Sequence, residues 1–442
     1  MIPCSTLSKR FVRLASTNAA NKYKIVVVGG GSAGVTVASQ IYNKFAAIGK
    51  PLSNGDIAIV DAAPYHYYQP GWTLVGSGLL DKEDTRKPMG DVIPKFVSHI
   101  PESVKSFSPQ KSSITTTTGR DIAYDTLVVA AGIQSNWNGI KGLSEALADP
   151  KSGVASIYSY DTCNKVWDEI QRLNGGQAIF TQPAGVIKCA GAPQKIMWMA
   201  WDEFRRTDRL SKNKVDFYTG MPSMFSVKKY SDALNDMRQA RGVGGHFQHN
   251  LSAIDVANRE ASFTTANGAT VKAAYDLLHV TPPMGPMDFI KGSPIADAAG
   301  WVSVNPATLQ HTDERFQNIF AIGDCSSLPT SKTAAAVTAQ APVMTENLVS
   351  FMDTGKVADA SYDGYTSCPL LTGYGELMLA EFKYGLEPQE TFGAFWDQSK
   401  PNRFFYHLKK DVFPAAYWNL MLQGNWFGSK SIFRPTFNKK ST

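Results

Sequence analysis

Residues 24–34, KIVVVGGGSAG, constrain the fold of this 442-residue chain more than any other stretch. Four of them, residues 25–28, are consecutive β-favouring apolar residues, which are typical of a buried parallel strand. Three glycines follow in G-x-G-x-x-G spacing, which predicts a tight turn into a helix whose N-terminus can approach a pyrophosphate. The alternative is a glycine-rich turn that binds nothing. The candidate cofactor-binding residues of this turn are Gly29, Gly31, Ser32, Ala33 and Gly34.

The sequence after this turn fits a dinucleotide-binding unit. A second predicted strand, residues 57–60, ends in Asp61, whose carboxylate is placed to accept hydrogen bonds from a ribose hydroxyl. An aromatic loop follows, in which Gln69 either donates to the edge of a flavin or nucleotide or belongs to a packing loop. We expect this loop to pass over the bound cofactor.

Two more positions are predicted to contact the same cofactor. Residues 124–132 read as a strand that runs into a small-residue turn, and a glycine such as Gly132 lets the backbone approach a ligand closely. Val104 is a further candidate cofactor-binding residue.

A later stretch favours FAD over NAD as the cofactor. Residues 316–324 form a predicted strand that ends in Gly323 and Asp324, and a carboxylate there can bind the ribityl chain of a flavin. Residues 331–337 read as the start of a helix that includes Lys332, and its N-terminus can stabilise negative charge on a reduced flavin. We therefore predict non-covalently bound FAD.

Between these parts the pattern restarts as a second α/β unit, from about residue 151 to residue 283. In a reductase with two dinucleotide domains, the turn after its first main strand carries a second glycine motif for NADH or NADPH. Residues 182–195 hold a proline and Cys189 instead. The sequence thus argues against a nicotinamide reductant and offers a thiol in its place.

Composition excludes several classes of protein. With 43% hydrophobic and 19% charged residues the chain is typical of a globular protein. Its net charge of +6 is not gathered into one basic run, so we expect no nucleic-acid partner. His246 and His249 lack neighbouring carboxylate or thiolate ligands, so we predict no metal site. The five cysteines include no C-x-x-C pair.

The two ends of the chain differ from the rest. Residues 1–21 contain Arg and Ser but no acidic residue, which predicts a mitochondrial transit peptide, the alternative being an ordinary tail. Residues 403–437 interleave aromatic and basic side chains without any stretch that could span a bilayer. This pattern indicates either a monotopic segment at a lipid surface or helices packed on the body of the protein.

Together these motifs resemble the flavoprotein disulfide reductase superfamily and, within it, the sulfide:quinone oxidoreductases of the mitochondrial type. The similarity extends from about residue 24 into the C-terminal tail, and its most specific segments are residues 186–195, 278–284, 323–336 and 363–370. The resemblance implies an α/β fold with two Rossmann-like domains and a C-terminal membrane-associating region. It also implies FAD, a redox-active pair formed by Cys189 and Cys368, and a place at the inner mitochondrial membrane.

The resemblance also implies an activity. Hydrogen sulfide would attack an oxidised Cys189–Cys368 bridge, leave a persulfide on Cys368 and free Cys189 as a thiolate, whose electrons reach ubiquinone through FAD. The persulfide sulfur would pass to a small acceptor such as glutathione or sulfite. Lys188 and Lys195 flank Cys189 and either lower its pKa or are solvated surface charges. The alternatives are a type II NADH:quinone dehydrogenase and a non-catalytic flavin-binding scaffold.

The predicted organisation has five parts: residues 1–21, the transit peptide; 22–150, the first part of the FAD-binding domain; 151–285, a second Rossmann-like domain without the NAD fingerprint; 286–350, the second part of the FAD-binding domain; and 351–442, a quinone- and membrane-associating region.

Overall fold

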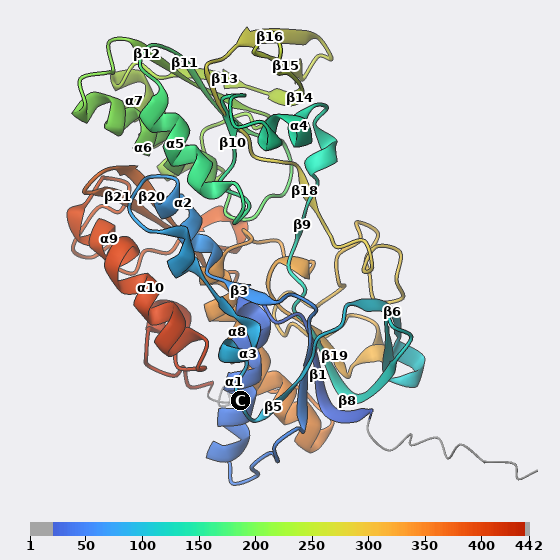
Figure 1. The fold of residues 1–442 in the computed structure, drawn as a ribbon. Coiled ribbons are helices and arrows are strands. Elements are labelled where there is room, and N and C mark those ends of the chain that lie inside the picture. The colour runs from blue at the N-terminus through green and yellow to red at the C-terminus, as the bar shows by residue number, and fades with distance from the viewer. Residues whose placement is uncertain (1–20, 438–442) are drawn as a thin grey trace, which may run out of the picture.

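The glycine turn joins the central strand of a seven-stranded sheet to the first helix of the chain (Figure 1). We obtained a computed structural model that describes residues 21–437; the predicted transit peptide lies outside this range except for Asn21. The sheet has the order β5-β2-β1-β8-β7-β6, with β19 paired to β8. Its strands are β1 (Lys22–Val28), β2 (Ile57–Val60), β5 (Val97–Ile100), β6 (Val104–Ser108), β7 (Ser113–Thr116), β8 (Asp121–Val129) and β19 (Ile319–Ala321).

Strands β5, β2, β1, β8 and β19 are mutually parallel, so their carboxyl ends meet at one edge. Residues Ile25 to Val28 are at most 2% exposed, as expected for a strand covered on both faces. The helices α1 (Ser32–Ala47) and α8 (Ala334–Thr354) pack against each other beside this sheet. Because α8 ends at Thr354 with Gly355 in the left-handed conformation, the predicted domain bound at residue 350 falls inside a helix.

A small layer follows β2 and carries the aromatic loop. Strands β3 (Tyr65–Tyr67) and β4 (Arg86–Pro88) pair with each other, and two short helices flank them, α2 (Trp72–Val75) and α3 (Met89–Val92).

The second unit has a five-stranded parallel sheet of order β10-β17-β11-β12-β13. A two-stranded ribbon connects it with the first unit, and an antiparallel meander extends it (Figure 1). The strands are β9 (Gln134–Ser135) and β18 (Met284–Gly285) in the ribbon, β10 (Val154–Ala155), β11 (Gly176–Gln182), β12 (Asn213–Thr219), β13 (Gly244–Phe247) and β17 (Leu277–His279) in the sheet, and β14 (His249–Asp255), β15 (Glu260–Thr265) and β16 (Thr270–Ala274) in the meander. The helices are α4 (Leu143–Ala148), α5 (Cys163–Arg172), α6 (Ala192–Arg206) and α7 (Lys228–Ala240).

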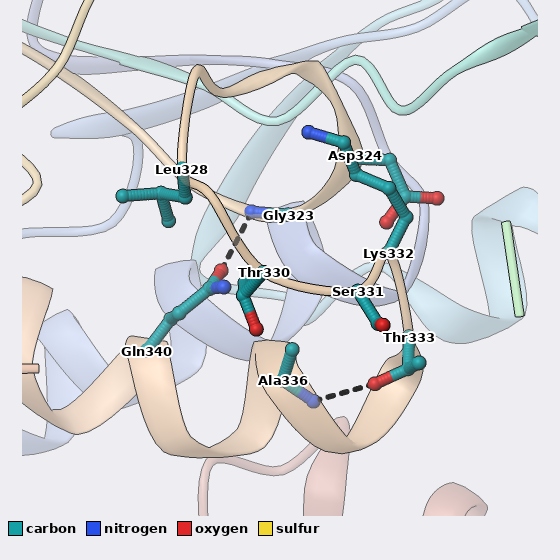
Figure 2. A pocket seen from close by; sticks show the side chains of 9 residues that line it. All are labelled: Gly323, Asp324, Leu328, Thr330, Ser331, Lys332, Thr333, Ala336 and Gln340. Carbon is teal, nitrogen blue, oxygen red and sulfur yellow. Dashed lines mark hydrogen bonds between the residues drawn. The ribbon is translucent and has the colours of Figure 1, made fainter. Parts of the chain in front are cut away.

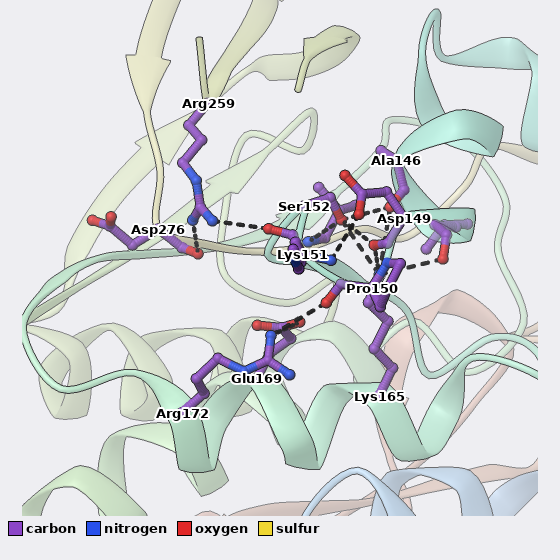
Figure 3. Close-up of polar contacts among 12 residues, drawn as sticks. Ala146, Asp149, Pro150, Lys151, Ser152, Lys165, Glu169, Arg172, Arg259 and Asp276 are labelled. Carbon is purple, nitrogen blue, oxygen red and sulfur yellow. Dashed lines mark hydrogen bonds and ion pairs between the residues drawn. The ribbon is translucent and has the colours of Figure 1, made fainter. Parts of the chain in front are cut away.

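One ammonium group fixes the loop by which the chain enters this second sheet (Figure 3). Lys165 on α5 donates from Nζ to the carbonyl oxygen of Asp149 at 2.6 Å, and to the carbonyl oxygens of Ala146 and Leu147. It therefore satisfies carbonyls that the short helix α4 leaves without partners at its C-terminus.

The C-terminal part returns to both units. The hairpin of β20 (Thr366–Gly373) and β21 (Glu376–Lys383), extended by β22 (Glu387–Pro388), packs against α6. The helices α9 (Arg403–His407) and α10 (Phe413–Ala416) alternate with two π-helical turns, Leu408–Val412 and Tyr417–Met421. Among residues 21–437, no helix combines the length and apolarity that a bilayer span requires.

Candidate active site

Three backbone turns meet at the carboxyl edge of the first sheet. A Cβ on Gly29 would lie 2.5 Å from the carbonyl oxygen of Ala130, so the turn after β8 lies directly against the glycine turn. Gly323, after β19, is also close to α1, because a Cβ there would lie 3.3 Å from the Cβ of Ala33. A Cβ on Gly34 would overlap the carbonyl oxygen of Gly29. The fold thus brings together predicted residues that are about three hundred positions apart.

The glycine turn is shaped to receive an anion. Gly31 is the N-cap of α1, no side chain within residues 21–437 caps this end, and a Cβ on Gly31 would meet nothing within 4 Å. The first N–H groups of this 16-residue helix thus have no side-chain acceptor, and the backbone at Gly31 leaves room for a ligand, which suits a pyrophosphate. Asp61 stands beside this turn and accepts a hydrogen bond from the Gly30 N–H at 2.6 Å. These features fit the adenosine end of FAD.

A second group of polar residues lines a pocket at the N-terminus of α8 (Figure 2). Burial raises the pKa of Asp324 and lowers the pKa of Lys332, and each charge opposes the shift of the other. Gln340 accepts from the Gly323 N–H at 2.9 Å, and Thr333 caps α8 by accepting from the Ala336 N–H. A partly buried carboxylate and the N-terminus of a long helix fit the flavin end of the same cofactor.

The remaining predicted cofactor-binding residues, Gln69, Gly132 and Val104, each have a different environment. Gln69 accepts a hydrogen bond at 2.8 Å from Nζ of Lys188, whose pKa burial lowers to about 8. Gly132 has a φ of +75°, and a Cβ there would meet nothing within 4 Å, so its backbone stays accessible. Val104 is 6% exposed, and its side chain belongs to the core of the first unit.

The two predicted catalytic cysteines lie next to each other. Cys189 Sγ is 3.9 Å from Cys368 Sγ, although 179 positions separate them. Cys189 adopts a φ of +52°, which is uncommon for a residue with a side chain, and its N–H donates to the carbonyl oxygen of Lys332 at 2.7 Å. The cysteine loop is thereby tied to the segment that carries the candidate flavin-binding residues.

Gly191 is the residue that lets the two sulfur atoms approach. A Cβ on Gly191 would lie 2.5 Å from Cys368 Sγ, which is far inside van der Waals contact. Its φ of −84° is ordinary, so the requirement for glycine here is steric rather than conformational.

Charges around the pair favour one thiolate. The neighbouring Cys368 thiol, followed by the charge of Lys195, holds the pKa of Cys189 well below its usual range. Lys195 Nζ lies 3.2 Å from Cys189 Sγ. The same pairing raises the pKa of Cys368, because a second thiolate beside the first is disfavoured.

A second cation, Lys409, lies close to the pair. Lys409, from the π-helical turn after α9, is 3% exposed and donates to the carbonyl oxygen of Pro70 at 2.8 Å. Burial and then repulsion by Lys195 lower its pKa to about 7.

Sequence reasoning missed part of this geometry. Cys368 is only 2% exposed on β20, because the hairpin packs its face against α6, and no local sequence signal indicates this burial. Lys188 was expected beside Cys189, but its ammonium bonds to Gln69. Lys409 was read only as part of an interfacial tail; the one signal for its burial was a lysine among aromatic residues.

This fold defines a class of protein, the flavoproteins with two Rossmann-like units. Residues 23–179 match the family described as pyridine nucleotide-disulphide oxidoreductase. The structure is also similar to the sulfide:quinone oxidoreductase of Aquifex aeolicus, with a TM-score of 0.72 at 19% identity over 90% of this chain and 92% of that one.

A chain of the Tetrahymena thermophila mitochondrial ATP synthase has the same fold, with a TM-score of 0.78 at 19% identity over 93% of this chain and 99% of that one. Likeness at this identity concerns the fold alone.

Sequence similarity specifies the family. The mitochondrial sulfide:quinone oxidoreductase of Schizosaccharomyces pombe is 52% identical over 96% of this chain and 95% of that protein. The chain therefore belongs to the sulfide:quinone oxidoreductase family, whose members are FAD-dependent oxidoreductases. An NADH dehydrogenase-like protein of Mycobacterium tuberculosis matches only 38% of the chain, at 28% identity. The NADH dehydrogenase predicted as an alternative is therefore only a distant relative of this chain.

Proposed function

We propose that this protein oxidises hydrogen sulfide at the Cys189–Cys368 pair and delivers the electrons to ubiquinone through bound FAD. The names of its relatives support both substrates. The single observation that carries the proposal is the approach of the two sulfur atoms to 3.9 Å, with the ammonium of Lys195 at 3.2 Å from one of them.

The oxidised form of the pair supplies the electrophile that sulfide requires. Sulfide attacks Cys368 Sγ of the Cys189–Cys368 bridge, a new S–S bond forms on Cys368, and the bond to Cys189 breaks. Cys368 then carries the persulfide and Cys189 leaves as a thiolate. Lys195 favours this direction of cleavage because its ammonium lies 3.2 Å from Cys189 Sγ, and the pKa of Cys189 is lowered whereas that of Cys368 is raised.

The persulfide leaves by a second exchange reaction. A small nucleophile such as glutathione or sulfite takes the outer sulfur atom and leaves Cys368 as a thiolate. Reformation of the Cys189–Cys368 bond then releases two electrons. When bound, FAD accepts electron pairs and passes them on to quinone.

Buried cations stabilise the state in which both cysteines are thiolates. Two adjacent thiolates repel each other, and Lys195 and Lys409 are the cations that act on both sulfurs. Lys409 can also take up or release a proton near neutral pH, because burial lowers its pKa to about 7.

We further propose attachment to the inner mitochondrial membrane through an aromatic patch formed by Phe395, Trp396 and Phe404. These side chains are 80%, 42% and 46% exposed, and the rings of Trp396 and Phe404 stack at 5.6 Å. Exposed Lys400 and Arg403 adjoin the patch in sequence. Aromatic rings with neighbouring cations are suited to an anionic lipid surface, where the quinone resides.

The experiment that tests this function uses the purified yellow holoprotein without oxygen. Sulfide alone should bleach the visible flavin band, and quinone should restore it. Bleaching by NADH but not by sulfide would support the NADH:quinone dehydrogenase, and bleaching by neither would support the non-catalytic scaffold.

A further inference from the structure

The C-terminal segment, defined here as residues 417–428, runs along helix α1. Ser39 donates from Oγ to the carbonyl oxygen of Leu422 at 2.7 Å, and Asn43 donates to the carbonyl oxygen of Gln423 at 3.1 Å. Gly424 lies so close that a Cβ would come within 2.8 Å of the Gln40 backbone nitrogen. The segment is therefore part of the first unit, although it lies almost four hundred residues after β1 (Figure 1).

Tyr417 is the residue of this segment that reaches the glycine turn. It is 3% exposed, and its hydroxyl lies 2.7 Å from Ser32 Oγ and 2.6 Å from Nε2 of His66. Nδ1 of His66 lies in turn 2.8 Å from the carbonyl oxygen of Gly30. The chain of contacts thus links the residues immediately before and after Gly31, the N-cap of α1.

The donors in this chain can be assigned from chemistry. A carbonyl oxygen only accepts, so His66 must carry its proton on Nδ1 and donate to Gly30. Burial lowers the pKa of His66, which keeps the ring neutral and leaves Nε2 as an acceptor. The Tyr417 hydroxyl must then donate to His66 and accept from Ser32, so every polar group in this series of contacts has a partner.

We propose that Tyr417 is a positioning residue for FAD: through Ser32 and His66 it holds the glycine turn in the conformation that receives the pyrophosphate. The C-terminal segment, through Tyr417, then helps to form the cofactor site. The inference rests on the FAD-binding role of the glycine turn and is independent of the sulfide chemistry.

The physical reason is preorganisation. The glycines that admit a pyrophosphate also make the turn flexible, because each loses more backbone freedom on ordering than other residues do. Hydrogen bonds that fix Gly30 and Ser32 before FAD arrives lower the ordering cost of binding. Their loss should therefore appear as faster release of FAD.

The test measures how fast FAD leaves the holoprotein after dilution, from the fluorescence of the released flavin. Tyr417→Phe keeps the ring and removes only the hydroxyl, and we expect release to become about fivefold faster, as for one net buried hydrogen bond. The matched control is Ser39→Ala, which removes a buried hydrogen bond between α1 and the same segment two turns away from the glycines. Release from this variant should equal that of the unmodified protein.

A double variant separates positioning from general stabilisation. If Tyr417 acts partly through Ser32, then Tyr417→Phe should accelerate release less in a Ser32→Ala background than alone. Unchanged release from Tyr417→Phe, equal acceleration by Ser39→Ala, or additive effects of the two substitutions would each overturn the proposal. None of these outcomes concerns sulfide turnover, so the proposed function could stand or fall separately.

Discussion

Lys195 Nζ lies 3.2 Å from Cys189 Sγ, across the loop that leads into α6. Lys195 sits in the first turn of the helix, where it is 2% exposed and its ammonium points back to the cysteine loop. Burial lowers the pKa of Lys195, but the two nearby sulfurs outweigh burial and the net shift is upward. The lysine therefore stays charged, and its charge adds to the effect of the Cys368 thiol in favouring the thiolate form of Cys189.

The first prediction removes this charge. Lys195→Met keeps an unbranched side chain one atom shorter and removes the charge, and the pKa of Cys189 should rise because its nearest cation is lost. The rate of alkylation of Cys189 by iodoacetamide in the reduced protein should shift to higher pH, and sulfide-dependent turnover at neutral pH should fall by about tenfold or more. The control is Lys188→Met, since Lys188 bonds to Gln69 and not to the sulfur. An equal shift in both variants would contradict the assignment.

The second prediction concerns the cysteines themselves. Cys189→Ser and Cys368→Ser should each lower sulfide-dependent quinone reduction by at least about a hundredfold, because neither leaves an electrophilic S–S bond. Cys325→Ser is the control. Its thiol is fully buried 3.3 Å from the carbonyl oxygen of Val129, and burial raises its pKa to about 11, so it is unsuited to exchange. Most of the turnover should remain in this variant.

The third prediction tests the close approach at Gly191. Gly191→Ala adds a methyl group that would lie 2.5 Å from Cys368 Sγ, so the sulfurs must separate. We expect turnover to fall by about a hundredfold or more while FAD content is retained. Gly90→Ala in α3 is the matched control, because a Cβ there meets nothing within 4 Å. Equal turnover in the two variants would show that the cysteine loop can move to accommodate the methyl group.

Local sequence signals predicted the parts of the site that depend on the backbone. The glycine turn, Asp61 and the Gly323–Asp324 turn each follow a strand, and parallel strands bring their carboxyl ends to one edge. The structure places all three at the edge formed by β1, β2 and β19. The fold class could therefore be predicted from short motifs and is confirmed.

Contacts between distant segments could not be predicted in the same way. Nothing in the local pattern around Lys409 shows that it lies near Cys189, because that contact depends on how the C-terminal helices pack. The amphipathic tail posed a second problem, since its pattern suits a lipid surface and a protein surface equally well. The structure divides it: Phe405 and Tyr417 are buried, whereas Phe404 and Phe433 are exposed.

The fourth prediction concerns stability against pH. Burial lowers the pKa of Lys409 to about 7, whereas a lysine in the unfolded chain has a pKa of about 10.4. Between these values the unfolded chain binds a proton that the folded protein lacks, so this residue makes stability rise with pH, by at most roughly 1.4 kcal/mol per pH unit. Urea unfolding of Lys409→Met should lack this contribution between pH 7 and 10. Lys410→Met, which changes a half-buried lysine paired with Asp411, should retain it.

The last prediction concerns the aromatic patch. Deletion of the tail would be a poor test of membrane attachment, because the C-terminal segment also bonds to α1 through Ser39 and Asn43. Point substitutions avoid this problem, since Phe395, Trp396 and Phe404 are exposed.

The triple variant Phe395→Ser, Trp396→Ser and Phe404→Ser should sediment with anionic liposomes at least about tenfold more weakly, because it loses the apolar area that enters the interface. Turnover with long-chain quinone should fall with it, while bleaching of the flavin by sulfide persists, because the cysteine pair is untouched. The matched control is Ile48→Ser with Val271→Ser, which removes side chains that are 40% and 38% exposed on α1's C-cap and on β16. If the triple variant binds liposomes as strongly as this control, the patch is not the anchor, and its exposure must serve another surface.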